Sequence, residues 1–187
     1  MNTSRSLRST YLALVLTGCA GAVTPAPPAV TPAPPPTAPG APASSTDDAL
    51  ARVAAIHGGA GPWAVAGYRM GAYALAKLGL DRQSFDLEVV HHTPREVQYS
   101  CIADGASAAT GASAGKLNLT LVDAPESGVE TTYRRKSTGQ TITLRPSAAF
   151  AARFKDVPRE QLAAAGKTVL GLPDADVFEE VPAPPKP

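Results

Sequence analysis

Cys101 and His57 are the two side chains of this sequence that could combine in thiol or metal chemistry. Cys101 begins the segment CIADGASAATGASAGKLNL, in which Asp104 follows three residues later and Thr110 and Lys116 stand among small residues. A cysteine thiolate beside an imidazole base is a pair that nucleophilic catalysis uses, and both groups also ligate zinc. The alternative for Cys101 is a buried cysteine that packs as a small apolar residue.

Two familiar motifs fail in the same segment. The letters Gly111-Ala-Ser113-Ala-Gly115 match a hydrolase nucleophile elbow, but in those hydrolases the histidine follows the serine, and all three histidines here precede Ser113. A phosphate-binding loop would need a glycine at position 110 and a serine or threonine at position 117. The chain has Thr110 and Leu117 there, so neither motif predicts a function.

The elements that must position these residues are those of one α+β domain. Ser45 or Thr46 can cap a helix that ends at His57, and Pro62 can begin a second, long helix that ends at Gly79. Alternating or β-branched runs predict a mostly antiparallel sheet packed against the long helix. The predicted strands are 84–92, 96–102, 116–124, 129–136 and 140–146, and two further short helices are predicted at 147–155 and 158–166.

The small residues between the second and third predicted strands indicate a short helix and glycine turns that pack closely. Asp104 and Lys116 could close this segment as an ion pair, or contact the polar groups of a ligand. His91 and His92 are adjacent, so on a strand only one of them can face inward and act as a further ligand. A solvated strand end is the other interpretation of this pair.

Two separated blocks of sequence resemble the E-subunit family of formylmethanofuran dehydrogenase. HGGAGPWAVAGYRMGAYALAKLG, residues 57–79, is similar to that family's H-G-H-x-x-P signature and the helix after it. SCIADGASAATGASAGKLNL, residues 100–119, is similar to its second signature, a cysteine, an aspartate three residues on, and T-G-C-T-x-G-K-x-N. The resemblance implies the family's fold over residues 45–178.

The resemblance also implies a groove in which His57 and Cys101 would hold zinc or another divalent metal, and Asp104, Thr110 and Lys116 would contact a ligand. Gly59, Gly61 and Ala112 replace residues of the signatures that could hold a soft metal. The implied function is therefore a domain that binds a small ligand or a weakly held metal in a degenerate groove without doing chemistry. A thiol-dependent enzyme or redox protein that uses Cys101 with His57 is the alternative.

The N-terminal residues have the order of a secretory leader. Arg5 and Arg8 precede the apolar run 11–16, which is too short to span a bilayer, and Leu16-Thr17-Gly18-Cys19 resembles the bacterial lipobox. Residues 1–18 are thus predicted to be a signal peptide. Cys19 is predicted to carry acyl chains, one of them palmitate. Ala20 in place of aspartate predicts a tethered lipoprotein at the outer membrane that faces the periplasm.

Composition bounds the remaining parts of the chain. Residues 19–44 form a proline-rich linker after the lipidated cysteine, and residues 179–187 are predicted to be a disordered tail. A net charge of +1 and the lack of basic runs exclude a nucleic-acid partner. The predicted partners are the membrane, through lipid, and a small molecule, while the oligomeric state stays open.

Overall fold

The first two helices begin and end at residues with strong local signals. The side chain of Ser45 accepts a hydrogen bond from the Asp48 amide and so caps α1, Thr46–His57. α2, Pro62–Leu78, has proline at its first position and ends at Gly79, whose φ of +61° is a left-handed conformation that glycine adopts without strain. Both predicted helices are confirmed.

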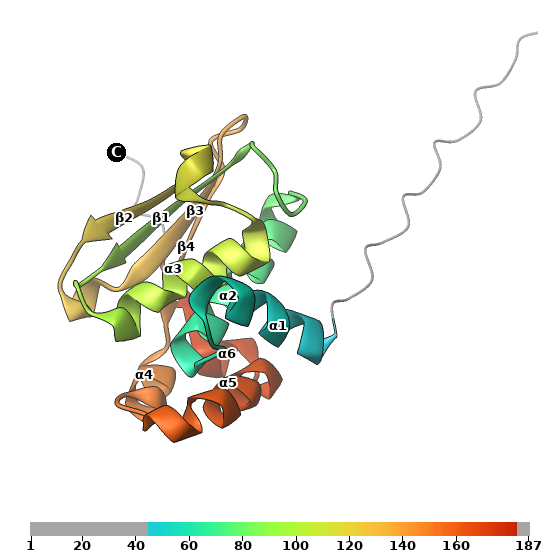
Figure 1. Ribbon diagram of the computed structural model, residues 1–187. Coiled ribbons are helices and arrows are strands. Elements are labelled where there is room, and N and C mark those ends of the chain that lie inside the picture. Colours follow the sequence, from blue (N-terminus) through green and yellow to red (C-terminus); the bar gives the residue numbers. More distant parts are fainter. Residues whose placement is uncertain (1–44, 183–187) are drawn as a thin grey trace, which may run out of the picture. The chain divides into compact units, whose positions relative to one another are not determined.

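The computed structural model of the protein describes residues 45–182, which belong to one compact unit, Ala41–Pro187 (Figure 1). The predicted signal peptide, lipidated Cys19 and linker lie outside the described residues. In the described part of the chain, no helix combines the length and the apolar character needed to cross a membrane.

The remaining elements complete an α+β fold, as predicted. The other helices are α3 (Val97–Thr110), α4 (Ala148–Phe154), α5 (Leu162–Gly171) and α6 (Asp174–Val177), with short 3-10 turns at Ala114–Lys116, Glu126–Gly128 and Arg159–Gln161. The strands are β1 (Leu87–Thr93), β2 (Leu119–Asp123), β3 (Glu130–Arg135), β4 (Thr141–Pro146) and β5 (Phe178–Glu180).

The five strands form one mixed sheet in the order β2-β1-β3-β4-β5. Three of the four neighbouring pairs are antiparallel, and β1 pairs with β2 in parallel. Parallel neighbours need a crossover connection, and α3 supplies it (Figure 1). The predicted strand at 96–102 is therefore wrong, because this segment lies within or just before helix α3.

Helices α2 and α3 cross with their backbones in contact, because each helix presents a glycine to the backbone of the other. A Cβ atom on Gly105 would lie 1.8 Å from the carbonyl oxygen of Ala64, and one on Gly67 would lie 2.1 Å from that of Ile102. No side chain larger than hydrogen fits at either position. The prediction that the small-residue segment packs closely is confirmed, and this contact sets the position of Cys101 and Asp104 relative to α2.

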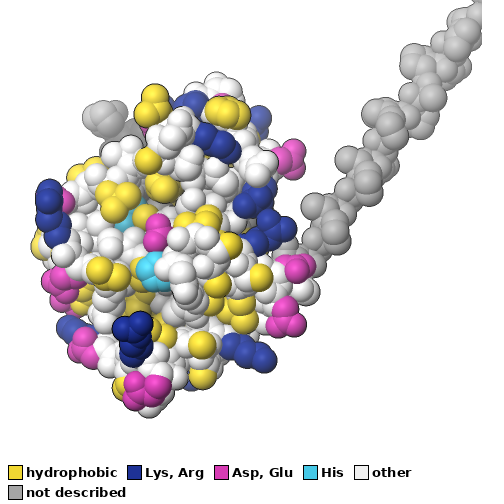
Figure 2. Space-filling model, in the orientation of Figure 1, with side chains coloured by type: hydrophobic (Ala, Val, Ile, Leu, Met, Phe, Trp, Pro, Cys, Tyr) yellow, Lys and Arg dark blue, Asp and Glu magenta, His cyan; other side chains and the backbone are white. Residues whose placement is uncertain are grey.

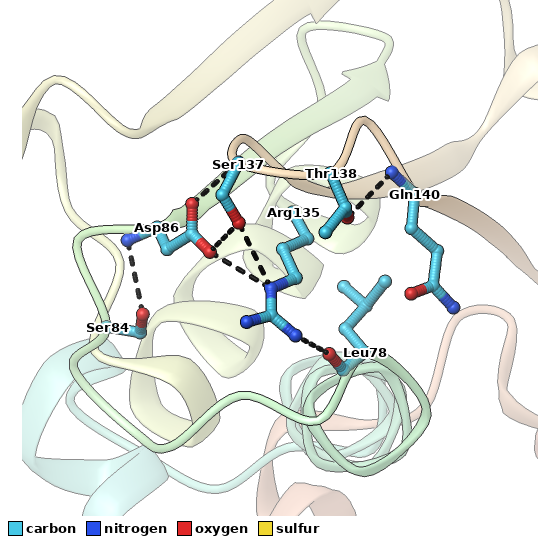
Figure 3. A network of polar contacts seen from close by, with 7 residues as sticks. All are labelled: Leu78, Ser84, Asp86, Arg135, Ser137, Thr138 and Gln140. Carbon is cyan, nitrogen blue, oxygen red and sulfur yellow. Dashed lines mark hydrogen bonds and ion pairs between the residues drawn. The ribbon is translucent and has the colours of Figure 1, made fainter.

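The hairpin between β3 and β4 is fastened to the end of α2 by a polar network (Figure 3). The Arg135 guanidinium lies 3.0 Å from the Asp86 carboxylate and donates to the carbonyl of Leu78, while Ser137 donates to Asp86 through its amide and hydroxyl. The Ser137 hydrogen bond, together with Arg135, holds the pKa of Asp86 below its usual value. The loop before β1 is thereby fixed against the hairpin.

The C-terminal boundary predicted at residue 178 falls short of the folded domain. β5 pairs with β4, with Arg145 opposite Glu179 and Leu144 opposite Glu180. Arg145 Nε lies 2.6 Å from a Glu179 carboxylate oxygen. Residues 179 and 180 therefore belong to the sheet and not to the predicted tail.

Candidate functional site

His57 is the last residue of α1 and points its ring at helix α3. Its Nδ1 atom lies 2.8 Å from Oδ2 of Asp104. Because a carboxylate only accepts hydrogen bonds, Nδ1 carries a proton, and in the neutral ring the lone pair is then on Nε2. The helix ends there because Gly58, with φ of +83°, turns the chain away. Asp104 therefore fixes both the orientation and the tautomer of His57.

Lys116 is the predicted ion-pair partner of Asp104, and this pairing is wrong. Lys116 Nζ donates to the Gly111 carbonyl at 2.9 Å and lies 5.2 Å from the ring centroid of Phe85. The buried Thr110 hydroxyl donates to the Ala106 carbonyl and accepts from the Ala112 amide. Thr110 and Lys116 thus hold the turn after α3, and the structure does not bring them to His57.

Cys101 lies one turn before Asp104 on α3, so both project from the same side of the helix. Its Sγ atom donates to the Gln98 carbonyl at 3.1 Å. Burial, and next the negative charge of Asp104, raise the pKa of the Cys101 thiol to about 12, although the Ala64 backbone partly opposes them. At neutral pH the group is a thiol, which is a weak nucleophile and a weak metal ligand.

His57 and Cys101 share the wall of one groove, with a volume of about 800 Å³. The groove lies between the α1–α2 connection, the first turns of α3, and the segment that leads into α5. Its lining comprises residues 57–63, Val97, Gln98, Cys101, Phe154, Val157, Arg159, Leu162 and Ala163. Most of these side chains are apolar, none is a carboxylate, and His57 and Arg159 are the basic ones.

Trp63 contributes to the wall of this groove and is the single tryptophan of the chain. Its Nε1 donates to the Phe154 carbonyl at 2.9 Å, and its ring meets Tyr99 and Phe150 edge-on at 5.0 Å. The same residue lines a second groove of about 550 Å³. Its fluorescence is therefore expected to respond to a molecule bound in either groove.

A zinc site in a protein normally has three or four nitrogen, sulfur or carboxylate ligands. Among residues 45–182, no three His, Cys, Asp or Glu side chains gather closely enough to hold a metal ion. His57 offers Nε2, and Cys101 offers a protonated thiol. The donor set on this groove wall therefore fits zinc poorly.

His91, for which a solvated strand end is one of the predicted settings, is fully buried under α3. Its Nε2 donates to the Tyr99 carbonyl at 3.1 Å, and its Nδ1 accepts from the Thr131 hydroxyl at 2.9 Å. Burial lowers the pKa of His91 to about 4. The solvated interpretation is wrong for His91, which is a neutral core residue with both ring nitrogens satisfied and none left for a metal.

Most residues of the groove wall could not be predicted from the sequence. Nothing in the sequence marks Phe154, Arg159 or Leu162, which come from more than 90 residues further along the chain than Trp63. The proline and tryptophan directly after His57-Gly-Gly-Ala-Gly are the available signal, because they place a large aromatic ring one short loop away from the imidazole.

Comparison with known proteins agrees with the two sequence blocks. No curated protein matches the chain. The family model described as FmdE, Molybdenum formylmethanofuran dehydrogenase operon, matches residues 56–179. The match contains His57, Cys101 and Asp104, all five strands except Glu180, and more than half of the chain. This protein belongs to the FmdE family.

Proposed function

We propose that this domain binds a small carboxylic acid with an apolar body in the groove lined by His57 and Trp63. Cys101 takes no part in a reaction there. The observation that carries the proposal is the His57–Asp104 pair, because its imidazole lines a mostly apolar groove. Asp104 leaves Nε2 of His57 as the ring atom that can take up a proton. A carboxylate binds there together with one proton, taken up from water, that is shared between Nε2 and a carboxylate oxygen in a charge-assisted hydrogen bond.

The charges around the groove favour an acidic ligand over a basic one. The lining holds no carboxylate, and Arg159 adds a second basic side chain to that of His57. α2 begins at the groove with Gly61 and Pro62 and has no acidic residue in its first turn. The positive end of its dipole is therefore not neutralised by its own side chains. Exposed Val97 and Leu162 add apolar surface for the body of the ligand.

The alternative, a thiol-dependent enzyme, has less support. A nucleophilic cysteine needs a lowered pKa or a base within hydrogen-bond reach. The pKa of Cys101 is raised to about 12, and its thiol is hydrogen-bonded to the Gln98 carbonyl. Binding of a divalent metal such as zinc also has less support. The described groove lining offers two metal donors, His57 and Cys101, where zinc normally has three or four.

Octanoate is the probe that tests the proposal, with octanol as its uncharged match. Trp63 fluorescence is expected to report binding of both, with octanoate about tenfold tighter or more, since hydrogen bonds to charged groups contribute about 1.5–3 kcal/mol. His57→Gln should reduce the preference for the acid to what Arg159 and the α2 dipole supply, and His92→Gln, on β1 outside the groove, should leave it unchanged. Tight binding of zinc with no response to octanoate would contradict the proposal.

We also propose that the domain is held in the cell envelope by lipid on Cys19, as an outer-membrane lipoprotein facing the periplasm. Support comes from the leader and lipobox residues alone, which precede the described part of the chain. Two acyl chains hold a protein on a bilayer stably, whereas one does so only marginally. The linker would then let the domain stand away from the lipid surface.

Cys19→Ala is therefore expected to move the protein from the membrane fraction to the soluble or secreted fraction. Loss of the acyl chains removes the covalent anchor, and no helix among residues 45–182 could span the membrane in its place. Fractionation of cells followed by immunoblotting measures the change, and Cys101→Ser serves as the matched control that should stay with the membrane. A Cys19→Ala protein that sediments with membranes like the wild type, and stays with them after a high-salt wash that releases proteins bound by charge, would show that the leader is misread.

A further inference from the structure

Three loops at one end of the sheet expose apolar side chains among cations, and they line neither groove. The loops are residues 82–85, 111–118 and 135–140, which we call the three-loop surface. They are joined by the Gln83 amide, which donates to the Thr110 carbonyl, and by Ser137, which donates to Asp86 directly after the first loop. Figure 1 shows the segment before β1 and the β3–β4 hairpin at this same end.

Two large apolar side chains project from this surface. Leu117 is 91% exposed and Phe85 is 68% exposed, the first and third highest values among the large hydrophobic residues of the described chain. Leu117 also has φ of +54°, a left-handed conformation that a leucine adopts only at a cost. Within the folded domain this residue gains no burial in return, so its side chain has no packing role to explain it.

The charge of the three-loop surface is positive. Its loops contain Arg82, Lys116, Arg135 and Lys136 and no carboxylate. Arg135 is neutralised by Asp86, but the other three form no ion pair with residues 45–182. An exposed acidic residue, Asp81, directly precedes the first loop. Figure 2 shows apolar and basic side chains next to each other over this end of the molecule.

We infer that the three-loop surface docks on an anionic phospholipid bilayer. Phe85 and Leu117 would enter the interface, while Arg82, Lys116 and Lys136 would face the lipid phosphates, as basic and apolar residues do in proteins that lie on membranes. The Lys116 amine lies 5.2 Å from the Phe85 ring centroid, so a basic and an apolar side chain of this surface are already adjacent. A specific protein–protein interface involves about 20–30 residues on each partner, more than these three loops contain, and Ala112 and Asn118 among them are buried.

The inference depends on neither the ligand groove nor the acyl anchor, so it can be tested without both. A protein that starts at Ser45, and so keeps all the described residues 45–182, would be sedimented with vesicles of phosphatidylcholine containing about one third phosphatidylglycerol. The Phe85→Ser, Leu117→Gly double variant is expected to bind about tenfold more weakly than the wild type. Its thermal midpoint should be equal or higher, because glycine relieves the left-handed strain at position 117. Leu121→Ser, which removes an exposed leucine on β2, is the matched control and should bind as the wild type does.

The contribution of the basic side chains to vesicle binding can be measured separately. Lys136→Glu and a rise in salt should each weaken binding, and vesicles of phosphatidylcholine alone should bind less protein. Equal binding of the wild type and the double variant, or binding that ignores both lipid charge and salt, would overturn the inference. So would sedimentation velocity that shows a dimer in the wild type and a monomer in the double variant, because the occupant of the surface would then be a second copy of the chain.

Discussion

Gly105→Ala is expected to lower the free energy of unfolding by about 3 kcal/mol or more, at the upper end of the overpacking range. The added methyl group would lie 1.8 Å from the carbonyl oxygen of Ala64, a backbone atom that cannot turn aside as a side chain can. α2 and α3 must therefore separate, and Gly67→Ala, which meets the Ile102 carbonyl, should act in the same way. Thermal or urea unfolding followed by circular dichroism measures the loss.

Gly171→Ala is the matched control for this prediction. Gly171 ends α5, and a Cβ atom there would meet nothing within 4 Å, so the substitution should be neutral or slightly stabilising through helix propensity. A Gly105→Ala protein with the unfolding midpoint of the wild type would show that α2 and α3 do not cross at backbone distance. It would also remove the basis for placing Cys101 and Asp104 beside α2.

The second large effect is a loss of stability in acid caused by His91. The folded protein holds this residue neutral, with a pKa of about 4 against 6.5 for the free side chain. The unfolded chain therefore binds a proton that the folded chain does not, and stability falls as pH drops from about 6.5 to about 4. At about 1.36 kcal/mol per pH unit, this group costs about 2 kcal/mol by pH 5 and about 3 kcal/mol by pH 4.

His91→Gln is the variant that isolates this contribution. It should be less stable than the wild type at pH 7, because the buried hydrogen bonds are replaced imperfectly, but its stability should fall less between pH 7 and pH 5. Urea unfolding at each pH gives the comparison, and carboxylates contribute little in this range because their usual pKa values lie near 4. Parallel losses of stability in both proteins would show that His91 is charged or exposed in the folded state.

Much of the helical framework could be predicted because its signals are local. Ser45, Pro62 and Gly79 each favour a helix end through one residue's own geometry or one capping hydrogen bond. The short strands could also be predicted, because the alternation of apolar and polar residues is visible over only a few positions. By contrast, Val97, Tyr99 and Ile102 favour a strand by intrinsic preference, and only the crossing with α2 through Gly105 makes the segment helical. The small residues of the segment indicate close packing, but they do not show that α2 is the partner or that the helix begins at Val97.

The candidate site was predictable in its central residues and not in its walls. The resemblance placed His57 and Cys101 together because two sequence blocks carry them, and the structure puts both on one groove. The pairing of Asp104 with His57 could not be read from spacing, since Lys116 was an equally suitable partner by charge. The burial of His91 depends on α3 covering β1, and a strand at residues 96–102 leaves no such cover.

The central claim is that Asp104 fixes His57 with Nε2 free for an acidic ligand, and side-chain nitrogen NMR of the histidines tests it most directly. The chain has three histidines, so three pairs of signals are expected. In the free protein, Nδ1 of His57 should carry the proton, and added octanoate should move the Nε2 signal toward the protonated range while leaving both His91 signals unchanged. A proton on Nε2 in the free protein, or a His57 signal that does not respond to octanoate, would contradict the claim.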